Sequence, residues 1–263
     1  MSIGIITGSG GDSLPGLAAR SSKEVATRFG PAHLTCGSMA GVDVVQISRH
    51  GDGHGRLSNH VNYRANVVAL RDANVECVIG LTVCGALDPG IELGSLIVFD
   101  DLHFPDNRLS DGSICTLHDQ PGVPGRGHWI FDRPYSEGLR ATLVSALGDT
   151  GIVVRNGGTY GHVDGPRFNS RSEIRALAAC GVTAISQTCG PETVLFGEAG
   201  VPYALVGYPT DYANGVAPEP TPLADLMRLV ERSVDVFAAA LVAALPSIAD
   251  AGVEPAGSHV TWE

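Results

Sequence analysis

Asp211 is an acid at the end of an apolar run, in a position where a carboxyl group could act as a proton donor. It follows Tyr203–Tyr208, a run rich in β-forming residues that predicts a strand, and Pro209–Gly215 is predicted to end that strand. Ligands in open α/β sheets bind beyond the carboxyl ends of strands. Apolar neighbours penalise the charged form of a carboxyl, so Asp211 could protonate a departing group at neutral pH. An Asx turn or a helix cap is the alternative interpretation of Asp211 alone.

Four further predicted strand ends carry groups that bind anions. They are Thr7–Gly11, Ser48–Gly51, Thr82–Ala86 and Ser186–Glu192. Glycines let backbone N–H groups approach an anion, hydroxyls add donors, and the arginine of the second segment offers a planar fork. Thr188 also precedes a predicted helix, whose N-terminus attracts negative charge. Together these segments favour an anion pocket, although each alone is compatible with ordinary turn chemistry.

Other chemistries at the same segments are less favoured. The first loop fails as a dinucleotide fingerprint, because G-x-G-x-x-G would need glycine where Ser13 stands. Arg49 could instead pair with an acid in the interior. His50 and His54 are four residues apart, as in some metal sites, but the intervening residues 51–53 include two glycines and disfavour a helix, so we predict no metal site.

Phe168 and Asn169 precede a predicted helix that Ser170 can cap. An aromatic ring in this position can cover a flat ligand, and the amide beside it can contact the edge of that ligand. The alternative is that Phe168 belongs to the core and that Asn169 caps the helix.

Composition limits the class of protein. Apolar residues make up 44% of the 263 residues and charged residues 17%, which predicts a large core and little disorder. A formal charge of −11 argues against a surface for nucleic acid or anionic membrane. Lys23 is the only lysine and follows no glycine-rich loop, so a Walker lysine and Schiff-base chemistry are both disfavoured.

The six cysteines form no C-x-x-C pair, which is typical of buried thiols in a reducing compartment. The sequence starts directly with a predicted strand, and no apolar run approaches membrane length. We therefore expect a soluble cytoplasmic protein that does not contact membranes.

Strand-like and helix-like segments alternate, which predicts one α/β layered domain over residues 1–248. The predicted strands are Ile3–Thr7, Val42–Ser48, Val75–Val83, Ser95–Phe99, Val153–Tyr160, Val182–Ser186 and Tyr203–Tyr208. The predicted helices are Ser58–Asp72, Ser136–Leu147, Arg171–Ala179, Glu192–Ala199 and Pro222–Ala244. Residues 101–134 lack periodicity and are expected to be functional or a subunit contact, and residues 249–263 are expected to be a loose tail.

Four longer motifs carry a resemblance that spans Ile3–Ala244. They are Ser48–Asn66 (SRHGDGHGRLSNHVNYRAN), Asp164–Arg171 (DGPRFNSR), Pro191–Gly200 (PETVLFGEAG) and Pro209–Gly215 (PTDYANG). In these motifs the chain resembles the trimeric purine nucleoside phosphorylase family, and most closely its 5′-methylthioadenosine phosphorylase branch. The resemblance implies phosphorolysis of a nucleoside without a metal or organic cofactor. It also implies a homotrimer of single α/β domains, each with a mixed, barrel-like central sheet flanked by helices.

The resemblance also implies roles for individual residues. Phosphate would be bound by Ser9, Arg49, His50, Thr82, the Val83 backbone and Thr188. The base would stack on Phe168, with Asn169 and Ala213 near its edge and Asp211 as the acid at N7. The ribose and the 5′ pocket would be formed by Gln187, His54, Leu223 and Met227, together with His128 from a neighbouring subunit.

Two positions depart from the family pattern. Ala213 stands where methylthioadenosine enzymes usually have a second acid, which leaves methylthioinosine or a general 6-oxopurine nucleoside as the alternative substrate. Gln187 replaces a methionine beside the ribose. A nucleoside-binding protein without catalytic activity is the alternative from another class, and the failed glycine fingerprint disfavours a nicotinamide-dependent oxidoreductase.

Overall fold

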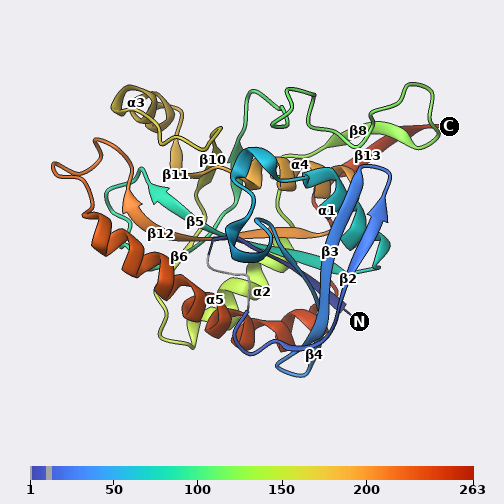
Figure 1. Cartoon of the computed structure of the whole chain (residues 1–263), viewed down its shortest axis with the longest axis horizontal. Coiled ribbons are helices and arrows are strands. Elements are labelled where there is room, and N and C mark those ends of the chain that lie inside the picture. Colours follow the sequence, from blue (N-terminus) through green and yellow to red (C-terminus); the bar gives the residue numbers. More distant parts are fainter. Residues whose placement is uncertain (1, 10–13) are drawn as a thin grey trace.

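The centre of the protein is a mixed β-sheet, which a computed structural model describes for residues 2–9 and 14–263 (Figure 1). Eleven strands form this sheet, in the order β2-β3-β4-β1-β5-β11-β10-β7, with β12 beside β5, β6 beside β12 and β9 beside β6. The strands are β1 Ser2–Thr7, β2 Ala18–Thr27, β3 Gly30–Met39, β4 Val42–Ser48, β5 Cys77–Ala86, β6 Leu96–Val98, β7 Asp101–His103, β9 Val154–Asn156, β10 Thr159–His162, β11 Val182–Ser186 and β12 Tyr203–Tyr212. The predicted α/β fold with a mixed sheet is confirmed.

The sheet branches at β5, and the resulting ring of strands is closed between β9 and β10 by the chain itself, without strand pairing. β5 pairs with β12, β12 with β6, β6 with β9, β10 with β11, and β11 again with β5. Gly157 and Gly158 join β9 to β10 with φ values of 98° and 137°, which residues other than glycine rarely adopt. This closure is the barrel-like feature that the resemblance implied.

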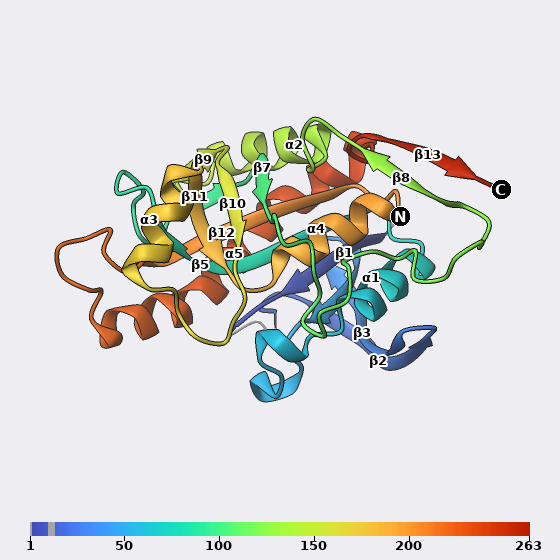
Figure 2. The ribbon, with the colours of Figure 1, turned by 90° about the horizontal axis from the view of Figure 1, so that it is seen from above.

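Helices cover both faces of the sheet (Figure 2). They are α1 Tyr63–Asp72, α2 Glu137–Gly148, α3 Arg171–Ala179, α4 Cys189–Glu198 and α5 Leu223–Ala251. One apolar core lies between the sheet and α1 and α4, and a second lies between the sheet and α2 and α5. A smaller cluster underlies α3 and includes Ile174 and Ala213.

Several predicted boundaries are correct because local chemistry fixes them. β4, β11 and α3 have the bounds predicted from the sequence. Ser170 accepts a hydrogen bond from the Glu173 N–H, and the Glu173 carboxylate accepts one from the Ser170 N–H. This capping box satisfies two otherwise unpaired N–H groups and so defines the start of α3.

The strand that carries Asp211 is longer than predicted. β12 continues past Pro209 to Tyr212, and its pairing with β5 shifts register between Pro209 and Asp211. A β-bulge inserts one residue, here Thr210, and tolerates a proline that could not donate a ladder hydrogen bond. The expectation that Pro209 ends the strand was therefore wrong.

Other differences concern segments with weaker local signals. Ser58–His60 is a separate 3₁₀ turn, and α1 begins at Tyr63 with Asn62 as its cap. The predicted strand Val153–Tyr160 is divided into β9 and β10, and α4 begins at Cys189, before Pro191. The β2–β3 hairpin was not predicted, since the exposed side chains of β2 give little apolar pattern.

The C-terminal segment is ordered, which corrects the expectation of a loose tail. β13 Ser258–Trp262 pairs antiparallel with β8 Arg126–Ile130, so the two form a separate ribbon. The Trp129 Nε1–H donates to the Ala256 carbonyl at 2.8 Å, and the Trp129 ring packs against Gly197 of α4. The ribbon is thereby fixed to the domain.

α5 also differs from expectation, because by length and composition alone it could cross a membrane. The sequence was predicted to contain no such run. Leu229, Phe237, Leu241 and Ile248 of this helix are buried in the core that α5 shares with α2 and the sheet. A core helix of a soluble domain passes the same length and composition test.

We predict that Gly197→Ala destabilises the protein although it places alanine in a helix. Alanine normally stabilises a helix by about 1 kcal/mol relative to glycine. A Cβ at position 197 would lie 2.3 Å from the Trp129 ring, so overpacking should instead cost about 1–3 kcal/mol and lower the Tm.

Gly138→Ala in α2 is the matched control, since its Cβ would meet nothing closer than 3.8 Å. It should leave the Tm unchanged or raise it. Equal Tm values for the two variants would contradict the packing of the ribbon on α4.

Candidate functional site

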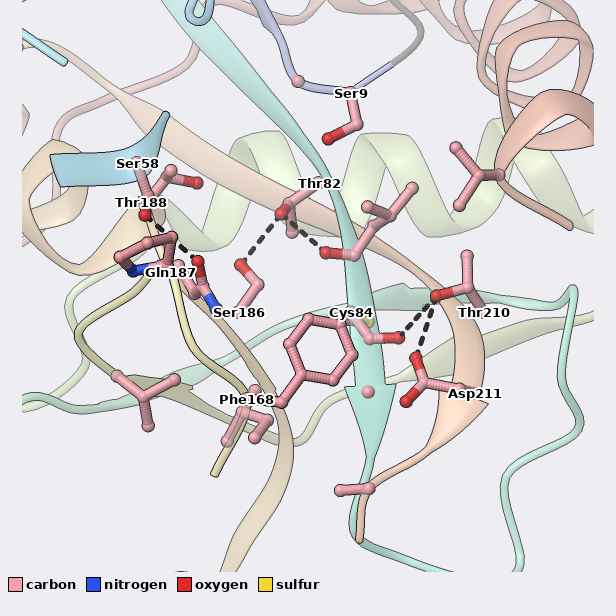
Figure 3. A pocket seen from close by; sticks show the side chains of 18 of the residues that line it. Ser9, Ser58, Thr82, Cys84, Phe168, Ser186, Gln187, Thr188, Thr210 and Asp211 are labelled. Atoms are coloured by element: carbon pink, nitrogen blue, oxygen red, sulfur yellow. Dashed lines mark hydrogen bonds between the residues drawn. The ribbon is translucent and has the colours of Figure 1, made fainter. Parts of the chain in front are cut away.

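A cavity of about 350 Å³ opens where several strands end (Figure 3). The residues after β1 and β4, the second half of β5, the end of β11 and the bulged end of β12 all line it. Val163, Pro166, Phe168 and Asn169, together with Leu226 and Val230 of α5, complete the wall. The pocket therefore lies where the sequence placed the ligand site.

Hydroxyl groups cluster at one end of this cavity. Ser9, Thr82, Ser186 and Thr188 all line it, and Figure 3 shows them on the side away from Asp211. Thr188 is the N-cap residue of α4, yet its side chain makes no capping hydrogen bond. Its hydroxyl lies 3.5 Å from the Cys189 sulfur, a weak partner, and it lines the cavity beside the backbone N–H groups of a helix N-terminus. Val83 also lines the pocket, while Gly10, Gly11 and Ser13 of the first loop lie outside the described residues.

Arg49 lines the pocket but is paired with an acid, as the alternative interpretation proposed. Its Nε and Nη2 donate to the two Glu192 carboxylate oxygens at 2.6 and 2.8 Å, and its Nη1 donates to the Leu81 carbonyl at 3.0 Å. Burial alone would lower the pKa of Arg49, but the Glu192 carboxylate raises it well above the usual value. Arg49 therefore stays charged, and its planar fork is fixed before any ligand arrives.

Glu192, the buried partner of Arg49, is a residue of the site that the sequence analysis missed. It is 1% exposed, and the Tyr203 hydroxyl donates to it at 3.1 Å. The one available signal was an acid at the start of a helix whose other residues are mostly apolar. Such an acid requires a buried cation as its partner.

His50 and His54 stack on each other at the pocket, with ring centroids 4.1 Å apart. His50 Nδ1 lies 2.8 Å from the Arg56 carbonyl, which can only accept, so Nδ1 carries the hydrogen. Among residues 2–9 and 14–263 no group of three or more His, Cys, Asp or Glu side chains is arranged to hold a metal ion.

Asp211 lies at the opposite end of the cavity from the hydroxyl cluster (Figure 3). Burial raises the pKa of its carboxyl above the usual range, and a hydrogen bond from the Thr210 hydroxyl, 3.0 Å from Oδ1, partly opposes that rise. Asp211 belongs to β12 and caps no helix, so the alternative interpretation as a cap was wrong. The carboxyl keeps its proton to a higher pH than an exposed aspartate does.

Phe168 is 65% exposed and its ring enters the pocket, so it is not a core residue (Figure 3). Asn169 also lines the cavity, and its carbonyl accepts a hydrogen bond from Asn214 Nδ2 at 2.7 Å. Ser170, not Asn169, caps α3. An exposed aromatic ring at the edge of a cavity provides a surface on which a flat ligand can stack.

Ala213 and Gln187 both line the cavity. The Ala213 N–H is used by the Ala86 carbonyl at 2.9 Å, so this residue offers the pocket only a methyl group. Gln187 accepts a hydrogen bond from the Ser58 hydroxyl at 3.0 Å and donates to the Arg167 carbonyl at 3.2 Å. Its side chain ties together two loops at the pocket instead of projecting freely.

Three predicted residues lie outside this cavity. Leu223 and Met227 are exposed, and the adjacent face of α5 contributes Leu226 and Val230 instead. The buried residues of α5 include Leu229 and Ser233. Their helical spacing in the sequence could have shown that Leu226 and Val230, and not Leu223 and Met227, lie on the side of the helix that faces the protein. His128 lies on the β8–β13 ribbon, edge-on to Trp262 at 5.2 Å.

Comparison with known proteins agrees with this geometry. The chain is 34% identical over 255 residues to S-methyl-5′-thioadenosine phosphorylase of Aedes aegypti, covering 94% of this chain and 89% of that protein. It is 30% identical to 6-oxopurine nucleoside phosphorylase of Pyrococcus furiosus, with 94% and 92% covered. The structure of methylthioadenosine phosphorylase from Schistosoma mansoni in complex with adenine superposes with a TM-score of 0.85, at 27% identity and with 95% and 92% covered.

The model of one protein family matches nearly the whole chain. It is described as the phosphorylase superfamily, and the match covers residues 2–246. This span contains the hydroxyl cluster of the cavity, the Arg49–Glu192 pair, Phe168 and Asp211. The chain therefore belongs to the phosphorylase superfamily.

Proposed function

We propose that the protein cleaves a purine nucleoside by phosphorolysis, with 5′-methylthioadenosine as its main substrate. The products are the free purine and 5-methylthioribose-1-phosphate. Membership of the phosphorylase superfamily and the names of its relatives support the reaction class. The observation that carries the proposal is the pairing of a half-buried carboxyl of raised pKa with a hydroxyl cluster across one cavity.

The reaction needs these two groups because it separates charge. A phosphate oxygen attacks C1′ as the C1′–N9 bond breaks, so positive charge develops on the sugar and negative charge on the purine. Phosphate bound by Ser9, Thr82 and Thr188 stabilises the sugar electrostatically. Asp211 transfers its proton to N7, and the base leaves neutral. In this proposal the chemistry requires phosphate as co-substrate and no further cofactor.

The remaining walls define the rest of the substrate. Phe168 stacks on the purine, with Asn169 and Ala213 near its edge. Leu57, Leu226 and Val230 give an apolar stretch of wall, which suits an uncharged thioether better than a phosphate monoester. A 5′-alkylthio nucleoside therefore fits better than a nucleotide.

We also propose that the protein acts as a homotrimer in the cytoplasm. His128 is exposed and lies outside the cavity of its own chain, so its predicted contribution to a 5′ pocket requires a neighbouring subunit. Ile130, Val260 and Trp262 of the same ribbon are exposed apolar residues, which is typical of a subunit contact.

A second candidate substrate follows from Ala213. Asp211 is the only carboxylate among the described residues that line the cavity. Without a second acid, the edge of the base meets the Asn169 amide, which can donate as well as accept and therefore discriminates weakly between 6-amino and 6-oxo purines. Methylthioinosine or another 6-oxopurine nucleoside is therefore the alternative substrate.

Replacing Asp211 by asparagine should lower kcat about 10²–10⁴-fold with methylthioadenosine, because the amide cannot supply the proton to N7. Phosphate-dependent release of adenine measures this effect. Asp164→Asn, which changes an exposed aspartate outside the cavity, is the control and should retain wild-type turnover. If the Asp211 variant turns over within a few-fold of the wild type, Asp211 is not the general acid. If the wild type binds nucleoside without turnover, the protein is a nucleoside-binding protein without catalytic activity.

Thr210→Val should extend activity to higher pH. The Thr210 hydrogen bond lowers the pKa of Asp211, so its removal raises that pKa further and keeps the acid protonated. Activity depends on the protonated form and is lost as the pH rises through this pKa. The descending limb of kcat against pH, measured at saturating substrates, should shift upward. A downward shift or no shift would show that this bond does not tune the acid.

The wild-type values of kcat/KM for methylthioadenosine and methylthioinosine should agree within about 100-fold, because the wall at Ala213 offers no acceptor. Ala213→Asp should then favour methylthioadenosine, since a carboxylate accepts from the 6-amino group and repels a 6-oxo group. Discrimination above about 10⁴-fold in the wild type would reveal a hydrogen-bonding group opposite the 6-position.

A further inference from the structure

A chain of hydrogen bonds runs from the start of α4 to the hydroxyl cluster of the pocket. The Cys189 N–H donates to the Tyr160 hydroxyl at 3.1 Å, and that hydroxyl lies 2.7 Å from Ser186 Oγ. Ser186 Oγ lies 2.9 Å from Thr82 Oγ1, which donates to the Val83 carbonyl at 3.0 Å. Figure 3 shows the bond between Ser186 and Thr82 at the pocket wall. Tyr160 itself does not line the cavity.

The burial of Tyr160 fixes the direction of this chain. Tyr160 is 0% exposed, and its oxygen already accepts the Cys189 N–H. Its own hydrogen needs an acceptor, because an unpaired buried donor is costly. Ser186 Oγ is the acceptor within reach, so Tyr160 donates to Ser186.

The same argument continues to the pocket. Because the Thr82 hydroxyl donates to the Val83 carbonyl, Ser186 is the donor in the bond between Ser186 Oγ and Thr82 Oγ1. The hydrogen of Thr82 is then the last in the series, and it points to the Val83 carbonyl or to a bound anion. Hydroxyls linked in one direction polarise one another, so the last one is a better donor. If the donor direction from Tyr160 through Ser186 to Thr82 were not fixed, the Thr82 hydroxyl could rotate. Its oxygen lone pair would then face the anion and repel it.

We propose that Tyr160 is a positioning residue that acts through Ser186 and commits the Thr82 hydroxyl to donate to phosphate. This inference rests on the proposed function, because it assigns phosphate as the anion at Thr82. Tyr160 touches neither substrate nor phosphate in this scheme. Its effect on the reaction is therefore confined to phosphate binding.

Tyr160→Phe tests the proposal, because it removes the hydroxyl and keeps the ring. Titration of inorganic phosphate into the protein, followed by calorimetry, should show affinity about three- to tenfold weaker than in the wild type. The KM for phosphate should rise by a similar factor, while the KM for methylthioadenosine stays within twofold. A parallel rise in both KM values would overturn the proposal, because it would indicate a general loss of structure.

Tyr135→Phe is the matched control. Tyr135 is also buried, and its hydroxyl accepts from Thr193 of the same helix α4 at 3.4 Å, but it does not line the pocket. This variant should lower the Tm without weakening phosphate binding. Equal loss of phosphate affinity in the Tyr135 and Tyr160 variants would overturn the inference.

Ser186→Ala, alone and combined with Tyr160→Phe, tests whether Tyr160 acts on Thr82 through Ser186. If Tyr160 acts through Ser186, adding Tyr160→Phe to Ser186→Ala weakens phosphate binding no further. If the losses of phosphate affinity in the two single variants add up in the double variant, Tyr160 does not act through Ser186 and the proposal is overturned. If Tyr160→Phe does not fold, unchanged phosphate affinity in Ser186→Ala still overturns the proposal, because the route runs through Ser186.

The binding assay needs no turnover, so the two proposals can fail separately. A wild-type protein that binds phosphate but cleaves no nucleoside would contradict the proposed function and leave the role of Tyr160 testable by titration. Wild-type turnover with unchanged phosphate affinity in Tyr160→Phe would contradict only the role of Tyr160.

Discussion

The buried ion pair between Arg49 and Glu192 connects the elements that surround the pocket. Arg49 follows β4 and also donates to the Leu81 carbonyl of β5, while Glu192 belongs to α4 and accepts from Tyr203 of β12. Removing one partner of a buried pair typically costs about 3–5 kcal/mol, because the other charge is left uncompensated. The pair therefore holds the start of α4, and with it Thr188, against the end of β4 before a ligand binds. Such preorganisation is what electrostatic stabilisation of a transition state requires.

This pairing also determines how the pocket attracts an anion. The molecule has a formal charge of −11, and Glu192 compensates the charge of Arg49. The attraction at the hydroxyl end comes mainly from oriented dipoles, namely hydroxyl groups and the N-terminus of α4. At the other end, burial raises the pKa of Asp211, which favours the neutral form of its carboxyl. In the proposed function the cavity thus separates the end that binds phosphate from the end that carries the acid.

The sequence predicted those parts of the structure that local chemistry determines. The Ser170 capping box and the apolar runs of β4 and β11 specify their elements through neighbouring residues, and those bounds were correct. The meeting of β1, β4, β5 and β12 at one cavity was also predictable, because these strands run parallel and their carboxyl ends gather at a common edge. β11 runs antiparallel to β5, so its arrival at the same cavity did not follow from that rule. What the sequence could not provide depends on contacts between distant residues. Glu192 acquires its role from Arg49, 143 positions away, and the chain from Tyr160 to Thr82 exists only after β5, β10 and β11 have packed.

The bulge at Thr210 has a consequence for how such an acid can arise in evolution. Side chains alternate between the two faces of a strand, so an unbulged β12 would direct residue 211 away from the cavity. The inserted residue instead allows two consecutive side chains, the Thr210 hydroxyl and the Asp211 carboxyl, to line the same cavity. The acid and the group that tunes its pKa are therefore encoded by adjacent codons, and mutation can change either one without altering another strand.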